Sequence, residues 1–372
     1  MELVKLLKPL LVYLRIYGIS LQTPDMTKKM RKFIMISAMI NLIYLAIVPM
    51  VSSILFVIRK NLKMEDRSKI HFFIYCGNYI IHASVIFETF LTKEKQMNFW
   101  NTLLMIEQTF SKYRNFLGEA NKCLSNKLYL RILVLSSLSM ICKIIIWICN
   151  LQFKKSTDWY FIEIVTTLSQ ETGRLIFFSN FLFVEILRMH VKLYNDKTRE
   201  ISKMARKYNR KTLLNELNIL KTRHSLIWKL NGLNSFLQWS LTLNFLHSFL
   251  HITYLLYWFY VVNTLRGLEY TLFGMFTFLV ISIITLVHLV YSCEMLKQET
   301  QKTPPLIHVI TQELSNPFDV DIHDSIMAIS MQIQHEKIFI TSAGFFKIDM
   351  ALLTAIIATI TTYLVIFIQF IG

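Results

Sequence analysis

Glycine, proline and charged residues are all scarce in this sequence. Its 372 residues include only 9 glycines and 6 prolines, 17% of them are charged, and 54% are hydrophobic. A soluble domain usually carries about a quarter charged residues, so this chain has too little polar surface to cover a core in water. The composition therefore excludes an ordinary soluble protein and favours lipid as the solvent.

Cysteine pairs and catalytic motifs are also missing. The five cysteines form no CxxC pair and lie mostly inside apolar runs, which excludes a disulfide framework and a cysteine metal site. No nucleophile or metal-ligand spacing indicates catalysis, so we expect no enzyme, no catalytic residues, no metal and no cofactor. A secondary transporter would show two related halves and spans broken by glycine or proline, and neither is present.

Seven long apolar stretches are what the sequence does contain. A helix needs about 20 apolar residues to cross a bilayer. Stretches of roughly that length lie near 33–58, 70–91, 132–153, 159–187, 236–262, 270–293 and 348–371. The sequence thus predicts an all-α membrane protein with seven transmembrane helices.

Lysine and arginine predict the orientation of these helices. Thirty lie in the N-terminal segment and in the loops 93–131, 188–229 and 297–347, whereas only eight lie in the three alternate loops. Basic residues are retained in the cytoplasm during insertion. The N-terminus should therefore be cytoplasmic and the C-terminus extracellular, which is opposite to the arrangement of G-protein-coupled receptors.

The long loops on the basic side predict a helical layer in the cytoplasm. Region 188–229 repeats apolar residues at helical spacing, as if helices four and five continued below the membrane. Two further helices are expected, one from Pro304-Pro305 and one over 322–336. The net charge of +16 then indicates contact with water and membrane lipid phosphates, with no role in binding nucleic acid.

These features divide the chain into four segments. They are a cytoplasmic N-terminal segment (1–32), helices 1–6 with their cytoplasmic extensions and a ligand-pocket bundle (33–296), a cytoplasmic helical anchor region (297–347) and a seventh helix (348–372).

The seventh helix has one small, polar face. At 100° per residue the following side chains form a stripe roughly 100° wide: Ala351, Thr354, Ala358, Thr361, Thr362, Val365 and Gln369. Small and hydroxyl residues in a membrane helix serve either close helix packing or the lining of a water-filled path. The stripe alone leaves both uses open.

A motif at the end of this helix resembles a known family. Thr362-Tyr363, five apolar residues and Gln369-Phe370 follow the T-Y…Q-F pattern that the insect gustatory receptors carry at the same place. The lead-in from Ser342 to Asp349 is also similar to theirs. The close resemblance covers about the last thirty residues, and the rest of the chain is similar in span number, orientation and length.

The resemblance implies a ligand-gated, non-selective cation channel for monovalent and divalent cations. Four subunits, identical or mixed with other gustatory receptors, would each give helix seven to a central pore. The resemblance places Gln369 and Phe370 at the outer constriction, and it implies a multi-pass protein in the plasma membrane of a sensory neuron, at the dendrite, axon or soma. The sweet-receptor branch carries an acidic residue where this chain has Leu364, so we expect a bitter or otherwise aversive tastant. Sugar or internal nutrient sensing, and an accessory role in a heteromeric receptor, remain alternatives.

Polar and aromatic groups in the outer halves of the spans are the candidates for ligand binding, because buried polar groups in a membrane usually face a cavity or a partner. They are Tyr79, His82, Asn150, Glu171, Arg174, His247, His251, Tyr254 and Trp258.

Each candidate also has a structural interpretation. Glu171 and Arg174 are three residues apart and can simply neutralise each other. His247 and His251 have a spacing that suits a metal, but no third ligand lies in the same run. The outermost aromatic residues, from Tyr257 to Tyr260, also fit an interfacial belt.

Overall fold

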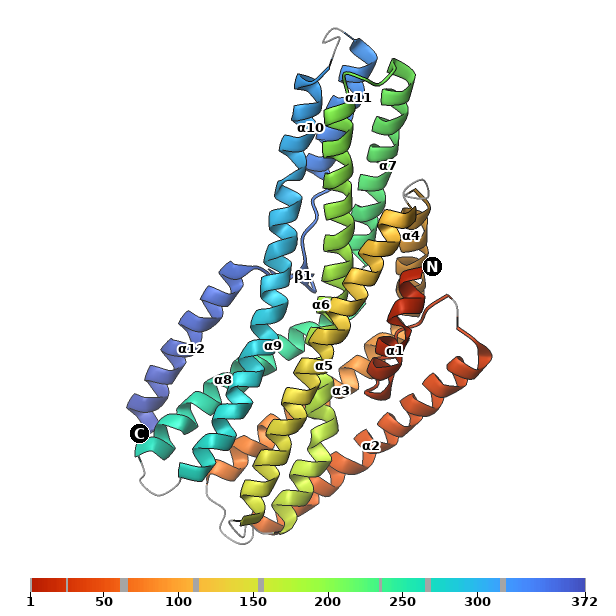
Figure 1. Cartoon of the computed structure of the whole chain (residues 1–372). Helices are drawn as coiled ribbons and strands as arrows, with labels where there is room; N and C mark the ends of the chain where they lie inside the picture. The colour runs from red at the N-terminus through yellow and green to blue at the C-terminus, as the bar shows by residue number, and fades with distance from the viewer. Residues whose placement is uncertain are drawn as a thin grey trace.

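The computed structural model describes residues 2–24, 26–60, 66–109, 114–152, 157–233, 236–264, 269–314 and 319–371. This part of the chain forms twelve helices and one short antiparallel ladder (Figure 1). In chain order these are α1 (Glu2–Ile16), α2 (Lys28–Lys60), α3 (Asp66–Leu91), α4 (Lys93–Thr109), α5 (Arg114–Gln152), α6 (Thr157–Met204), α7 (Arg210–Leu233), α8 (Gln238–Thr264), α9 (Glu269–Gln301), α10 (Thr303–Gln312), α11 (Val320–His335), β1 (Thr341–Ser342), β2 (Phe346–Lys347) and α12 (Met350–Ile371).

The seven predicted spans fall on seven separate helices, which confirms the predicted all-α membrane fold. These helices are α2, α3, α5, α6, α8, α9 and α12. By length and composition alone, four stretches of the described residues are apolar enough to cross a membrane: Lys28–Val51, Leu117–Ile145, Leu279–Gln312 and Met350–Gln369.

The helices form an elongated bundle with two different ends. Figure 1 shows α7, α10 and α11 gathered at one end, beside the continuations of α6 and α9. The other end contains α2, α3, α5, α8 and α12. Two short helices that the sequence predicts are present: α10 has two prolines in its first turn, and α11 ends one residue before the end of the expected 322–336 region.

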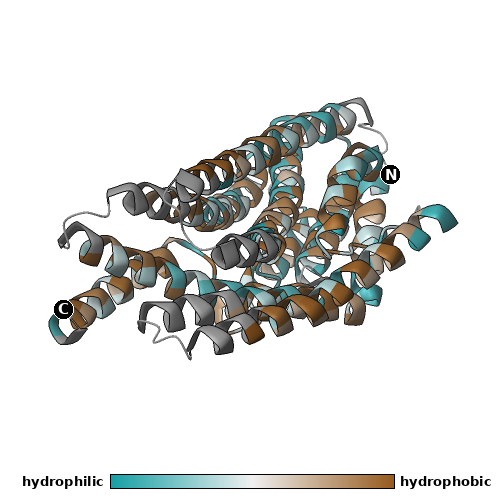
Figure 2. Ribbon diagram, turned by 90° about the horizontal axis from the view of Figure 1, so that it is seen from below, coloured by the Kyte–Doolittle hydropathy of each residue, from teal (hydrophilic) through white to brown (hydrophobic). Residues whose placement is uncertain are grey.

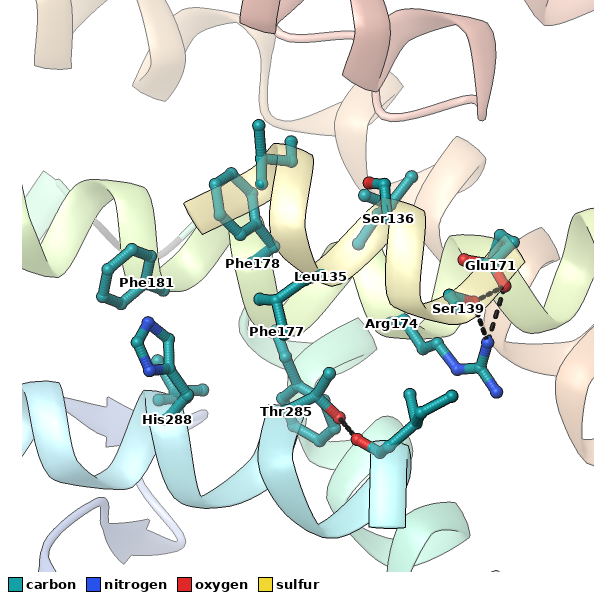
Figure 3. A pocket seen from close by; sticks show the side chains of 14 residues that line it. Leu135, Ser136, Ser139, Glu171, Arg174, Phe177, Phe178, Phe181, Thr285 and His288 are labelled. Carbon is teal, nitrogen blue, oxygen red and sulfur yellow. Dashed lines mark hydrogen bonds and ion pairs between the residues drawn. The ribbon is translucent and has the colours of Figure 1, made fainter. Parts of the chain in front are cut away.

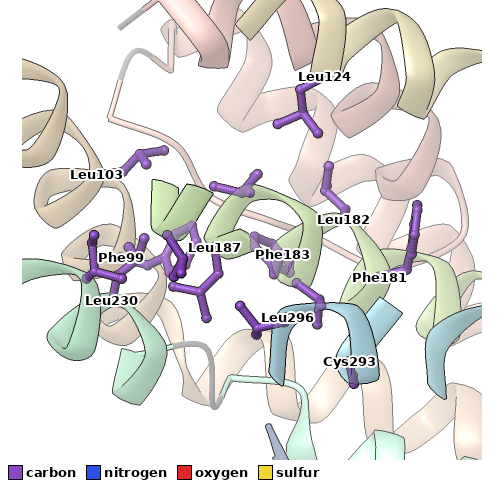
Figure 4. Close-up of a cluster of buried hydrophobic side chains, with 14 of the residues drawn as sticks. Phe99, Leu103, Leu124, Phe181, Leu182, Phe183, Leu187, Leu230, Cys293 and Leu296 are labelled. Atoms are coloured by element: carbon purple, nitrogen blue, oxygen red, sulfur yellow. The ribbon is translucent and has the colours of Figure 1, made fainter. Parts of the chain in front are cut away.

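Helix α6 lies at the centre of the bundle. Phe183 of α6 packs edge-on against Phe99 of α4 and against Phe236, with ring centroids 5.1 and 4.7 Å apart. Leucines of α6 and Leu296 of α9 continue this core (Figure 4). The cluster joins the membrane helices to the helices of the opposite end.

The outside of the bundle is apolar. Large hydrophobic side chains such as Met39 on α2, Phe87 on α3 and Leu133 on α5 are more than half exposed. Seen along the bundle, hydrophobic residues colour the outer helices, including α12 near the C-terminus (Figure 2). Such extensive apolar surface is stable only in lipid or against other chains.

The sequence predicts that transmembrane helices four and five continue below the membrane, and the continuation of the fifth is interrupted. Helix α6 does continue to Met204, but 210–233 forms a separate helix, α7, and α8 starts anew at Gln238. The carboxylate of Glu88 on α3 accepts hydrogen bonds from the backbone amides of Trp239 and Ser240, at 2.9 and 2.8 Å. A continuous helix would use these amides internally, so Glu88 stabilises α8 as a helix with its own beginning.

The N-terminal segment is more structured than its description as a cytoplasmic segment suggests. Helix α1 buries Leu3, Leu7 and Leu14 completely. These residues follow the spacing of one helical face, and α1 packs along α5. Tyr129 of α5 donates a hydrogen bond to the carbonyl oxygen of Leu6 at 2.6 Å.

Candidate functional site

Helices α5 and α6 bring one carboxylate and two cations together inside the bundle. Oε1 of Glu171 lies 2.6 Å from Nη1 of Arg174 and 2.5 Å from Nζ of Lys143. Ser139 donates a hydrogen bond to the same oxygen at 2.6 Å and also contacts Arg174. Two cations thus surround one carboxylate at membrane depth, where ionisable groups usually face a partner or a cavity.

A small cavity does lie beside this cluster, between α5, α6 and α9. Figure 3 shows Glu171, Ser139 and Arg174 at one side of it and Phe178, Phe181 and His288 at the other. The rings of Phe181 and His288 are 4.4 Å apart. The cavity measures about 30 Å³. Such a space holds only about one or two water molecules, so a larger ligand would have to displace the aromatic wall.

His82 belongs to a second, closed polar cluster. Its ring nitrogens lie 3.0 Å from Oγ of Ser169 on α6 and 3.0 Å from Oδ1 of Asn41 on α2. The ring is fully buried and packs 5.8 Å from that of Tyr44, which also neighbours Tyr79 at 6.5 Å. With both ring nitrogens engaged, His82 connects three helices as a satisfied buried histidine.

The candidates on α8 form a third group. The His247 ring lies against the backbone of Gly77 on α3, where an added Cβ would come within 2.4 Å of the imidazole. Glycine at position 77 therefore leaves the space that the imidazole of His247 occupies. The rings of His247 and His251 are 5.8 Å apart, and the buried Tyr254 and Trp258 follow at 6.1 Å from each other.

The structure therefore distributes the predicted ligand-binding residues over three clusters. Glu171 and Arg174 are together, as their spacing predicts, whereas His82 and the α8 residues lie elsewhere. The side chain of Asn150 is outside the described residues. Lys143, Ser139, Asn41 and Ser169 complete these clusters but were not among the candidates, and of these only Lys143 had a usable signal, as a charge inside an apolar run.

Metal binding has no support in the described residues, since no group of three or more histidine, cysteine, aspartate or glutamate side chains lies together there.

Helix α12 lies at the edge of the bundle and packs through one face only. Ile360 is buried with Ile252 and Leu255 of α8 and Leu279 of α9. Further contacts join Tyr363 to Phe249 at 6.0 Å and Phe367 to Tyr257 at 5.7 Å. The residues that contact α8 and α9 thus lie outside the small, polar stripe that the sequence predicts.

The small, polar stripe of α12 points away from the bundle. All of the stripe residues named above are exposed in the chain, and the side chain of Phe370 is outside the described residues. Thr354, Thr361 and Thr362 each donate a hydrogen bond to the carbonyl four residues earlier, at 3.1, 2.9 and 3.0 Å. Their hydroxyl protons are therefore used within the helix, which leaves oxygen lone pairs on the open face.

A tight hairpin connects this helix to the rest of the molecule. Residues 341–347 turn at Ala343 and Gly344, which have φ angles of 47° and 77°. Ser342 and Thr242 of α8 share a hydrogen bond of 2.7 Å. Asp349 then caps α12 by accepting from the amides of Ala351 and Leu352, and it pairs with Lys297 of α9 at 3.2 Å.

Comparison with known sequences assigns almost the whole chain to one group. The model of the 7tm chemosensory receptor family matches residues 7–371. Two similar proteins of Drosophila melanogaster are those named gustatory receptor 28b, 29% identical over 92 residues, and gustatory receptor 28a, 34% identical over 68 residues. These matches cover 25% and 18% of this chain, and they span only 19% and 14% of the relatives.

Comparison with solved structures shows the same fold over the full length. The insect olfactory receptor OR5 from Machilis hrabei in complex with eugenol superimposes with a TM-score of 0.68 at 15% identity, covering 99% of this chain and 98% of the receptor. A second structure of the same receptor also superimposes with a TM-score of 0.68, at 14% identity and covering 98% of both chains.

Proposed function

Because the chain belongs to the 7tm chemosensory receptor family, we propose that it is a gustatory receptor and a ligand-gated, non-selective cation channel. The family places it among multi-pass membrane receptors rather than enzymes. The proposal adds the channel, its ions, its assembly, its orientation and its ligand.

The exposed polar face of α12 is the observation that carries the channel proposal. A membrane helix whose threonines face lipid gains nothing from them, whereas a helix beside water does. This face has no partner within the described part of the chain. Four copies around an axis would bring four such faces together and bury the flanking apolar residues, in a homomer or in a heteromer with other gustatory receptors.

The chemistry of this face suits cations. The threonine protons are taken by carbonyls of the helix, so the hydroxyl oxygens present lone pairs. No charged side chain lies on α12. Neutral oxygen ligands without a charged ring favour cations with little discrimination between monovalent and divalent ions.

For the ligand, we propose a small bitter or otherwise aversive molecule, bound from outside near the cluster of Glu171, Arg174 and Lys143. The polar groups of this cluster and the aromatic wall beside it suit a compound with a hydrogen-bond acceptor and an apolar body. The solved complex of an olfactory receptor of the same fold with eugenol supports a small-molecule ligand. The plasma membrane, with a cytoplasmic N-terminus, is the proposed location.

Cysteine accessibility tests the pore. Cysteine would replace Thr354, Ala358, Thr361 and Val365 in turn on the open face, with Ile360→Cys on the packed face as the matched control. Thiol reagents applied from outside should reduce agonist-evoked current in the open-face variants and spare the control. If no open-face cysteine reacts in either the resting or the activated state, α12 is not the pore helix.

A second measurement tests ion selection and ligand together. The chain would be expressed alone and recorded with a panel of bitter compounds and sugars. Gln369→Glu should raise the divalent-to-monovalent permeability ratio, because it adds a negative charge near the outer end of the pore. Responses to sugars alone would overturn the aversive ligand, and silence alone with currents after co-expression would indicate an accessory subunit.

A further inference from the structure

A second cavity lies away from the predicted ligand-binding residues, where α6, α7, α9 and α11 meet the segment 336–349. It measures about 540 Å³. Cavities of about 300–1,000 Å³ accommodate small-molecule ligands, so this space is large enough as it stands, whereas the cavity beside Glu171 would first have to open.

The wall of this cavity has an apolar body. Ile227 of α7, Leu296 of α9 and Ile333 of α11 line it together with Ile338 and Phe339. The wall also includes His224 and Tyr194, whose rings pack edge-on at 5.8 Å. Both of these side chains are buried.

The charges at the cavity are unequal. Its two carboxylates are already engaged, because Glu336 accepts from His224 at 3.1 Å and from Gln332 at 2.7 Å, and Asp349 pairs with Lys297. Lys337 and Lys347 are exposed at the same wall, and neither lies within 4.0 Å of a described carboxylate. Lys347 instead stands 5.0 Å over the ring of Phe339. Two positive charges therefore remain beside an apolar interior.

We propose that this cavity binds a small amphiphilic anion from the cytoplasm, with its acidic head at Lys337 and Lys347 and its apolar body against Ile338 and Leu296. An apolar floor that ends in two free ammonium groups complements a medium-chain carboxylate. The placement in the cytoplasm rests on the orientation under the proposed function.

The segment 336–349 connects this site to the start of α12. Residues 336–340 and 347–349 of this segment form one wall of the cavity, and the segment ends at Asp349, which caps α12. A ligand bound to this wall stabilises its position, and any movement of the start of α12 then costs more free energy. Occupancy should therefore modulate the current evoked by an outer ligand.

The test uses the full chain in nanodiscs of phosphatidylcholine with dodecanoate as the probe. Binding is measured by calorimetry, and hydrogen exchange is followed over 336–349. Wild-type protein should bind dodecanoate and protect this segment. Lys337→Ala with Lys347→Ala should weaken binding roughly tenfold, as expected from losing two exposed charge contacts.

Three controls make the result specific. Lys211→Ala with Lys229→Ala removes two exposed lysines of α7 outside the cavity and should leave binding unchanged. Thr300→Phe narrows the cavity and should also weaken binding. Dodecanol, which has the chain without the charge, should bind at least roughly tenfold more weakly.

Each other outcome overturns the proposal. Absence of binding to the assembled receptor means that the cavity is closed, for example by a neighbouring subunit. Binding that neither lysine removal nor Thr300→Phe affects means partition into the bilayer. If nanodiscs with phosphatidylinositol abolish dodecanoate binding in wild type, a membrane lipid is the occupant rather than a soluble anion. Because binding is measured without current, this result is independent of whether α12 forms the pore.

Discussion

Helices α6 and α12 each contain a predicted membrane span, yet their surroundings are opposite. From Thr166 to Leu187, most side chains of α6 are buried against other helices. Of the apolar window of α12, only 6% is buried within the chain. Within a single copy of the chain, α6 is thus packed on most sides, whereas most of the surface of α12 is exposed.

This difference separates the structural from the functional use of a membrane helix. Polar groups of α6, such as Glu171 and Ser169, are engaged by neighbouring helices. The threonines of α12 bond only to their own helix and face outward. The position of a polar side chain relative to its neighbours, rather than its presence in the span, indicates its role.

The largest expected effect tests the packed side of the comparison. Phe183→Ala removes a ring that contacts Phe99, Trp100 and Phe236. We expect a loss of about 3–5 kcal/mol in the free energy of unfolding, because a large buried cavity remains. Ile357→Ala on the open side of α12 should change the stability of the single chain by less than about 0.5 kcal/mol. Thermal unfolding in detergent measures both, and equal losses would contradict the contrast.

A smaller effect is expected at the start of α8. Glu88→Ala leaves the amides of Trp239 and Ser240 without their acceptor, which should cost about 1–3 kcal/mol. Glu88→Gln keeps an acceptor oxygen, so its free energy of unfolding should fall by less than that of Glu88→Ala. Thermal unfolding of the two variants, with hydrogen exchange at 238–242, measures the effect. Equal exchange in wild type and both variants would show that Glu88 does not stabilise the helix start.

At the start of α12, Asp349→Ala should cost about 1 kcal/mol and raise hydrogen exchange in the first turn. Asp349→Asn retains the cap but loses the ion pair with Lys297, so its exchange should stay closer to wild type. If the asparagine variant exchanges as fast as the alanine variant, the ion pair rather than the cap holds this turn.

The smallest effect is a pH dependence at His224. Burial lowers the pKa of His224 below its ordinary value, although the nearby Glu336 opposes this. The unfolded chain then binds more protons than the folded one as pH falls through the ordinary histidine range, so acidification destabilises the protein. From pH 7.5 to 5.5 we expect a loss of less than about 1 kcal/mol, measured as a lower Tm, and His224→Gln should flatten it. Lys297, Lys337, Lys347 and Asp349 line the same cavity, so salt should be constant across the series. A Tm that rises on acidification would mean that protonated His224 forms a stable ion pair.

The spans and the two faces of α12 could be predicted because they depend on short-range features of the sequence. The length of an apolar run fixes a span, and the 100° helical period separates Thr354 and Thr361 from Ile360. The buried face of α1 was also readable, since Leu3, Leu7 and Leu14 follow that period.

The grouping of the polar residues could not be predicted, because chain order does not state which helices are neighbours. Glu171 and Arg174 share one helix, so their pairing follows from spacing. The contacts of His82 with Asn41 and Ser169 need the packing of α2, α3 and α6. The separation of α7 from α8 likewise depends on Glu88, which is 151 residues before Trp239.

Helix α8 contacts both the hairpin that leads into α12 and α12 itself. Thr242 and Phe245 fix Ser342 and Phe346, and farther along the same helix Phe249 and Tyr257 contact α12 itself. The distance along the chain between these two anchor points is therefore set by the geometry of α8. An inserted or deleted residue between 341 and 349 would change the spacing between the hairpin and α12, so that both could no longer make their contacts with α8. Many substitutions there would leave this spacing unchanged. Chain length in this segment should accordingly be far less variable among related receptors than its amino acids.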